Sequence, residues 1–273
     1  MQLRFWGVRG SAATPGPTTL EYGGNTACVE LKAPRNVELQ TPGDEAIVFD
    51  GGTGIRELGL HLPARRIHLF LTHFHWDHIQ GIPFFGPLYN PANHVTIYSS
   101  RFSAPLQAAL TGLMAEPYFP VRFEALGAKI ELVDLGSSET RVGDVTVRAF
   151  EANHPQGACG YRIDSGGAGA VYSPDREHGH PRLDQVLAGA ARGANVLVID
   201  SQYTPEEYPS HQGWGHSSWR ESIHVARAAG VKRLVLFHHD PSHNDEMLHT
   251  IQAEARREFP ETYVAKEGWT VEI

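Results

Sequence analysis

Apolar residues along the chain occur in short runs separated by polar or glycine-containing stretches. A continuous run bounded by turn residues, as at 66–71 and 196–199, predicts a buried strand. Apolar residues that recur every three or four positions, as at Leu106, Leu110 and Leu113, predict a helix. The predicted strands cover 3–8, 26–31, 46–49, 66–71, 95–98, 130–133, 145–150, 159–163, 170–172, 196–199, 233–237, 262–265 and 269–272, and the predicted helices cover 105–114, 182–191, 216–229 and 242–257.

Two of these helices carry end signals. Gly230 follows the helix predicted over 216–229 and acts as a C-terminal stop. Ser242 is the expected N-cap of the last helix, with Asp245 and Glu246 in its first turn, where the helix dipole favours acidic residues. Strands dominate the first half of the chain and alternate with helices in the second. This order predicts two mixed sheets with helices on the outer faces.

The chain shows no internal repeat, low-complexity tract or linker. We therefore expect a single domain over residues 1–273. Residues 33–44 are polar and contain proline, which predicts a hairpin loop between two strands.

The densest chemistry in the sequence follows the predicted strand at 66–71. The pattern H-x-H-x-D-H places His73, His75, Asp77 and His78 within six residues. In an extended segment, His73 and His75 point the same way because side chains alternate with period two. Asp77 and His78 follow as the chain turns, so they can face a second point nearby. The motif therefore predicts two adjacent metal positions.

H-x-H-x-D-H after a hydrophobic strand resembles the signature of the metallo-β-lactamase superfamily. The resemblance implies an αββα sandwich and a centre of two divalent metal ions. We expect zinc, with manganese or iron as alternatives. It also implies that Asp50, which ends the strand at 46–49, lies behind the metals and orients a ligand histidine.

Two further ligands are expected where predicted strands end. His154 follows the strand at 145–150, and Pro155 interrupts regular structure directly after it. Asp175 follows the strand at 170–172, and a carboxylate can give one oxygen to each of two metals. We expect Asp175 to bridge them, with Asp200 as its rival or as a residue behind the ligands.

The last ligand is one of two adjacent histidines. His238 and His239 follow the strand at 233–237, and their side chains should point in opposite directions. In the superfamily the last ligand stands directly at the end of such a strand. The resemblance therefore favours His238 and leaves His239 as the alternative.

His216 lies in the sequence Gly215-His216-Ser217-Ser218. This arrangement resembles the ribonuclease Z-like branch of the superfamily and the small phosphodiesterases related to it. The resemblance implies that His216 is a catalytic group near the scissile phosphate, and Asp77 is expected to orient the nucleophile as well as bind metal. Trp76 and Trp214 flank these residues, and they could stack a nucleobase or simply pack in their loops.

Together these residues predict a phosphodiesterase that cleaves a small phosphodiester or a cyclic nucleotide with a hydroxide bridging two metals. The same centre could instead hydrolyse a lactone, a thioester or a β-lactam, or the chain could bind metal without catalysis. The formal charge of −8 argues against an extended nucleic-acid surface, so we expect a small substrate.

The remaining expectations concern the setting of the protein. Its two cysteines form no disulfide framework, and its first residues lack the features of a signal peptide. The sequence contains no apolar run of membrane-spanning length. We therefore expect a cytoplasmic protein that does not bind membranes. The resembling branch also suggests a homodimer.

Overall fold

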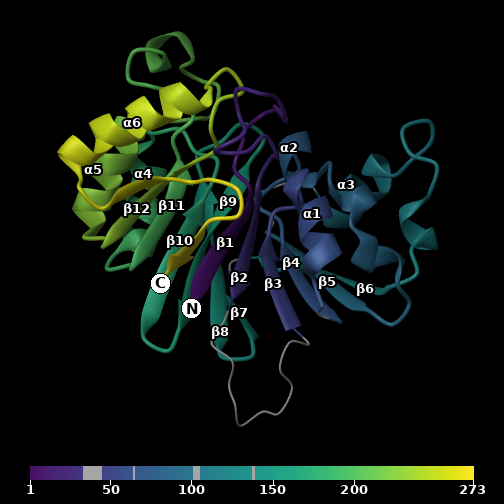
Figure 1. Cartoon of the computed structure of the whole chain (residues 1–273). Helices are drawn as coiled ribbons and strands as arrows, with labels where there is room; N and C mark the ends of the chain where they lie inside the picture. The colour runs from purple at the N-terminus through teal and green to yellow at the C-terminus, as the bar shows by residue number, and fades with distance from the viewer. Residues whose placement is uncertain (33–44, 64, 101–104, 137–138) are drawn as a thin grey trace.

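The fold consists of two seven-stranded β-sheets that pack face to face, with helices covering their outer faces (Figure 1). We describe it from a computed structural model covering residues 1–32, 45–63, 65–100, 105–136 and 139–273. The loop expected at 33–44 lies outside the described residues. The αββα sandwich implied by the sequence is confirmed.

The first sheet has the strand order β14-β1-β2-β3-β4-β5-β6. Strands β3 to β6 are parallel, whereas β1 and β2 pair in antiparallel fashion. The strands are β1 (Gln2–Gly7), β2 (Cys28–Lys32), β3 (Glu45–Phe49), β4 (Arg66–Phe70), β5 (His94–Ser99), β6 (Lys129–Asp134) and β14 (Thr270–Glu272).

The second sheet has the order β13-β12-β11-β10-β9-β8-β7. Strands β10 to β13 are parallel, and β7 to β9 extend the sheet as an antiparallel meander. The strands are β7 (Glu139–Val142), β8 (Val145–Ala152), β9 (Ala158–Ser165), β10 (Ala168–Ser173), β11 (Val196–Asp200), β12 (Arg233–Phe237) and β13 (Thr262–Val264).

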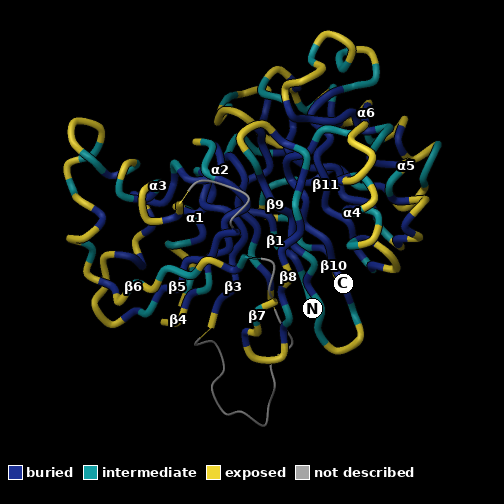
Figure 2. Tube along the Cα trace, turned by 180° about the vertical axis from the view of Figure 1, so that it is seen from behind, coloured by how far each residue is buried: buried dark blue, intermediate teal, exposed yellow. Residues whose placement is uncertain are grey.

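Three hydrophobic clusters hold these layers together. The central one lies between the sheets and includes Phe5, Phe49, Tyr161 and Phe237. The other two pack helices on the outer face of each sheet, and the buried centre of the tube in Figure 2 follows this layering. The helices are α1 (Gly54–His61), α2 (Trp76–Ile79), α3 (Leu106–Leu113), α4 (Pro181–Ala191), α5 (Trp219–Ala229) and α6 (Asp245–Glu258), with 3₁₀ turns at Ile82–Phe84, Gly86–Tyr89, Phe123–Ala125 and Tyr208–Ser210.

Most predicted elements are present, and the differences are local. Helices α1 and α2 and strand β7 were not predicted. Helix α5 begins at Trp219 rather than at residue 216, because Ser218 has extended backbone angles. The N-cap of α6 is Asn244, whose side chain accepts a hydrogen bond from the Met247 amide, so the prediction of Ser242 was wrong. Gly230 ends α5, as predicted, and the structure shows it in a left-handed conformation.

The arrangement of the strands determines where chemistry can occur. Parallel strands present their carboxyl ends at one edge of a sheet. The segments that follow β3, β4, β8, β10, β11 and β12 therefore meet at the same end of the sandwich. Within the described residues, no helix is both long and apolar enough to cross a membrane.

Candidate functional site

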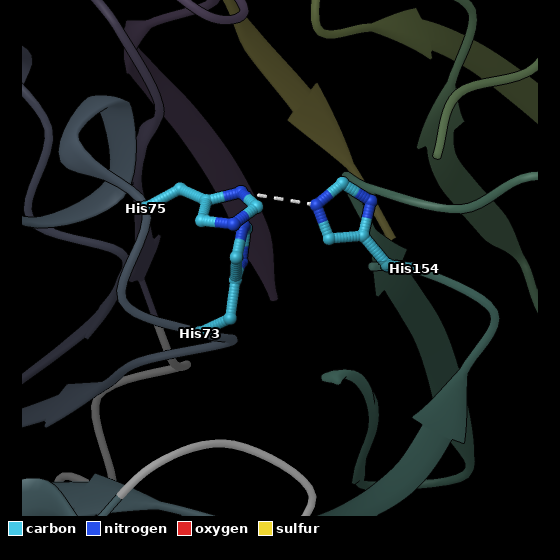
Figure 3. Close-up of side chains that lie close together, drawn as sticks. All are labelled: His73, His75 and His154. Carbon is cyan, nitrogen blue, oxygen red and sulfur yellow. Dashed lines mark hydrogen bonds between the residues drawn. The ribbon is translucent and has the colours of Figure 1, made fainter. Parts of the chain in front are cut away.

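The site lies where loops from both sheets converge. The loop from β4 into α2 carries the H-x-H-x-D-H motif, and loops from the second sheet supply the other donors. Figure 3 shows His73 and His75 facing His154 from the opposite side. The structure brings together all seven residues expected to bind metal, namely His73, His75, Asp77, His78, His154, Asp175 and His238.

Three of these residues form one set of donors, which we call set A: His73, His75 and His154. The atoms His75 Nδ1 and His154 Nε2 lie 3.1 Å apart (Figure 3). Two nitrogens bound to one tetrahedral zinc ion lie about 3.3 Å apart, so this spacing matches a shared cation. The Nε2 atom of His73 is buried without a hydrogen-bond partner among the described residues. A cation in set A would satisfy it.

A second set, which we call set B, consists of Asp77, His78 and His238. His238 Nε2 lies 3.0 Å from Asp77 Oδ2 and 3.3 Å from His78 Nε2. His78 Nε2 lies 3.3 Å from the same Asp77 oxygen. All three side chains are buried.

Asp175 lies between the two sets. Its Oδ1 atom is 3.0 Å from His78 Nε2 and 3.3 Å from His238 Nε2, on the side of set B. Its Oδ2 atom is 3.6 Å from His73 Nε2 and 3.8 Å from His154 Nε2, on the side of set A. Each oxygen therefore faces a different set, which is the geometry of a bridging carboxylate.

The outer nitrogens of set A are held by neutral groups. His154 Nδ1 donates to the Gly215 carbonyl at 2.9 Å, and His75 Nε2 donates to the Gln156 side-chain oxygen at 3.0 Å. The third residue, His73, places its Nδ1 3.1 Å from the Thr72 hydroxyl. Gly215 has a φ of +92°, and a Cβ there would lie 2.5 Å from His154 Nδ1, so only glycine fits.

Set B has a carboxylate behind it. His78 Nδ1 donates to Asp50 Oδ2 at 2.9 Å, which places Asp50 behind this imidazole. His238 Nδ1 donates to the Gln202 side-chain oxygen at 2.9 Å. The backbone amide of Ser11 donates to Asp77 Oδ2 at 2.7 Å. Sequence reasoning missed Gln156, Gln202 and Ser11, because no motif spacing links an amide or a backbone group to a distant histidine.

These outer contacts decide which nitrogens face the centre. In the five imidazoles of sets A and B, one ring nitrogen donates outward, so in a neutral ring the other carries a lone pair directed inward. Burial alone would raise the pKa of Asp175, but the surrounding imidazoles of His238 and His78 hold the pKa of that carboxyl well below its usual range. Burial lowers the pKa of His73 well below its usual value. Inward lone pairs and ionised carboxylates are a donor set that fits two divalent cations.

His216 lies beside both sets. Its ring centroid is 4.8 Å from that of His238 and 5.2 Å from that of His154. His216 Nδ1 donates to Asp200 Oδ2 at 2.8 Å, which leaves Nε2 as the free nitrogen. Burial alone would lower the pKa of His216, but the Asp200 carboxylate raises this pKa to about 9. Asp200 thus contacts His216 and does not take the bridging position.

The remaining candidates are separated by their surroundings. His238 joins set B, whereas His239 points away and donates from Nε2 to the Ala265 carbonyl at 2.8 Å. His238 has a φ of 64°, and a Cβ at Gly10 would lie 2.1 Å from its ring, so the N-terminal loop packs directly on it. Trp76 and Trp214 are exposed at the site.

Comparison with known proteins identifies the family. A family model described as "Beta-lactamase superfamily domain" matches residues 46–239, well over half of the chain. The chain belongs to the beta-lactamase superfamily. This range includes every member of sets A and B together with Asp50, Asp200 and His216.

One protein of known sequence and two solved structures show what this chain is similar to. Ribonuclease Z of Gemmatimonas aurantiaca is 27% identical, with 84% of this chain and 87% of that protein covered. Two solved structures are similar in fold at 18% identity: the metallo-beta-lactamase fold protein YhfI of Bacillus subtilis, with a TM-score of 0.74 over 100% of this chain and 98% of that one, and the short form of human tRNase Z, with a TM-score of 0.68 over 100% and 99%.

These relatives correct one expectation. The sequence predicted a small phosphodiester substrate and no extended nucleic-acid surface, whereas the relative from Gemmatimonas aurantiaca is named Ribonuclease Z, and a ribonuclease cleaves RNA. The prediction was wrong. It rested on the net charge of −8, which sums the whole chain and takes no account of where charges lie or of positive charge that two cations would add.

Proposed function

We propose that this protein is a metal-dependent phosphodiesterase that hydrolyses RNA. The observation that carries the proposal is the shared Asp175 between sets A and B, with His216 beside them. Two-metal sites of this kind hold both the attacking and the leaving oxygen in phosphoryl transfer. The relationship to ribonuclease Z supports RNA as the substrate.

Sets A and B would each hold one divalent cation, joined by Asp175. Zinc is the proposed metal, because imidazole-rich donor sets with few carboxylates suit it. When bound, the two cations lower the pKa of a water molecule and neutralise charge on the phosphate. The buried carboxylate of Asp77 remains ionised, because the pKa that burial would raise is held well below its usual range by His78 and His238. Asp77 can therefore accept a hydrogen bond from the attacking water and fix its orientation.

His216 is the proposed general acid. Its Nδ1 is bound to Asp200, so Nε2 can hold a proton and give it to the departing alkoxide as the phosphorus–oxygen bond breaks. Asp200 stabilises the protonated ring before this transfer. Nearby cations would lower the pKa of His216 from the value that Asp200 sets, which favours release of the proton.

The test compares activity and metal content in the same variants. We expect the metal-loaded protein to cleave bis-p-nitrophenyl phosphate and an RNA with a 3′ extension, and to leave a nitrocefin and lactone panel intact. His216→Ala should retain two metals per chain by elemental analysis and lose about 10²- to 10⁴-fold in turnover. His224→Ala is the matched control, because His224 lies on the exposed side of α5.

Two results would contradict this assignment. Loss of a metal in His216→Ala would make His216 a ligand rather than the acid. Lactone or nitrocefin turnover without diester cleavage would replace the phosphodiesterase with an acyl hydrolase.

A further inference from the structure

Two large aromatic side chains are exposed beside the site. Trp76 is 77% exposed and lies between His75 and Asp77 in the chain. Trp214 is 62% exposed and lies two residues before His216. Each comes from a different half of the sandwich. Exposed aromatic side chains next to the proposed catalytic residues indicate a surface that binds a ligand or a partner.

The loop that carries Trp214 is fixed in place by one carboxylate. Glu177 accepts a hydrogen bond from the Gly213 amide at 2.7 Å through Oε1 and from the Gly215 amide at 3.0 Å through Oε2. The Trp214 ring meets His211 edge to face, with centroids 4.9 Å apart. Because its loop is held in place, Trp214 loses little conformational entropy when it contacts a ligand.

Trp76 is presented differently. It is the first residue of α2, and its carbonyl accepts a hydrogen bond from the Gln80 amide at 2.7 Å. Within the described part of the chain, its ring makes neither a hydrogen bond nor a contact with another ring. With 77% of its surface exposed, this side chain is available to pack against a planar ligand.

The segments around the two tryptophans offer no exposed lysine or arginine to bind an RNA phosphate. The segments 9–14, 72–80, 153–157, 174–180, 200–218 and 238–243 contain no lysine, and their two arginines are buried. The Arg9 guanidinium donates to the Gly23 carbonyl, and that of Arg176 pairs with Asp184. Within these segments, contact with a nucleotide therefore depends on groups other than exposed cationic side chains.

We propose that Trp76 and Trp214 each stack on an unpaired nucleobase next to the scissile phosphate, so that the site accepts single-stranded RNA at the point of cleavage. A base within a duplex is already stacked on both faces and cannot offer one to an indole. This inference rests on the proposed function, since it places the bases around the phosphate that sets A and B would bind.

The test measures binding separately from cleavage. A fluorescein-labelled single-stranded RNA of about ten nucleotides, the same RNA as a blunt duplex, and an abasic strand of equal length are titrated into the metal-loaded His216→Ala protein. We expect Trp76→Ala and Trp214→Ala each to weaken single-strand binding about tenfold, and Trp→Phe to retain most of it. Binding of the abasic strand should be unchanged in all variants.

Salt distinguishes stacking from phosphate contact. The loss caused by each Trp→Ala variant should be the same at 50 mM and 200 mM salt, whereas loss of a phosphate contact shrinks as salt rises. Leu60→Ala, which alters an exposed apolar side chain of α1, is the control and should bind as the parent does.

Several outcomes would overturn the inference. These are binding within twofold of the parent, an equal loss with the abasic strand, or a variant that changes sedimentation of the protein while leaving RNA binding intact. The last would make the tryptophans a contact between two copies of the chain. Because binding is measured without turnover, a failure of the proposed chemistry appears separately, as inactivity of the wild-type protein towards bis-p-nitrophenyl phosphate.

Discussion

Sets A and B use similar residues in different surroundings. Set A has three imidazoles backed by a hydroxyl, an amide and a carbonyl, and His75 is partly exposed. Set B has two imidazoles and a carboxylate, all buried, and Asp50 adds a second carboxylate behind His78. A carboxylate behind a ligand histidine raises its basicity and its affinity for metal.

The difference teaches how one short motif can build two unequal sites. His73 and His75 lie in the loop between β4 and α2 and join set A, whereas Asp77 and His78 lie in α2 and join set B; His75, the N-cap of α2, still has extended backbone angles. The change of backbone conformation at His75 thus separates the two sets. We expect set B to hold its cation more tightly and set A to exchange its cation with solvent more readily.

The largest effect on metal affinity is expected at Asp175, which lies between the two sets. Asp175→Ala removes a ligand from both sets and leaves His73 Nε2 and His78 Nε2 without the carboxylate that both of them face. We expect the affinity for both metals to fall by more than the roughly 10- to 100-fold that removal of an outer partner costs. Competition with a chromophoric chelator, followed by elemental analysis, measures this. Weakening of only one metal would show that Asp175 serves one set and does not bridge.

The next effect on metal affinity should fall mainly on set B, because Asp50 contacts His78 directly and reaches set A only through the Thr72 hydroxyl behind His73. In Asp50→Asn, the amide can donate to His78 Nδ1, which forces the proton onto Nε2 and removes the inward lone pair. Asn also tolerates the φ of 59° at this position. We expect the tighter step of the chelator titration to weaken about 10- to 100-fold and the weaker step to shift less, because Asp50 contacts His73 only through Thr72.

The same titration checks the ranking of the two sets. If Asp50→Asn shifts the weaker step more than the tighter one, then set A binds its cation more tightly than set B, opposite to our expectation. The melting temperature of the metal-free variant serves as the control, because Asp50 also accepts a hydrogen bond from Tyr172.

Local patterns in the sequence, together with the resemblance of H-x-H-x-D-H to a known superfamily, were sufficient to predict the fold and the candidate ligands. Each ligand follows an apolar run, so the end of a predicted strand marked it, as at His154 and Asp175. Helix α1 was missed because its start, Gly51-Gly52-Thr53-Gly54, reads as a turn, although tertiary contacts with β1 and with the 3₁₀ turn at Ile82–Phe84 stabilise it.

The partners behind the ligands could not be predicted. Gln156 lies 81 positions from His75, and Gln202 lies 36 positions from His238. Neither distance follows from a local rule, because it depends on how the two sheets pack. Asp200 illustrates the same limit: its position at a strand end was clear, but its pairing with His216 required the structure.

The smallest effect on metal affinity is expected at Gln156, on the partly exposed side of set A. Gln156→Ala removes the acceptor of the His75 Nε2 hydrogen bond, and Gln156 is itself exposed, so water can take over the contact. We expect the weaker step of the chelator titration to shift by less than about tenfold and the tighter step to be unaffected.

Gln202→Ala is the matched change in set B, since the same amide group lies behind His238 but is buried. Water replaces a buried acceptor less readily, so this variant should weaken the tighter step more than Gln156→Ala weakens the other. Equal shifts in the two variants would mean that exposure does not distinguish the sets, and the carboxylates of set B alone would then account for any difference in affinity.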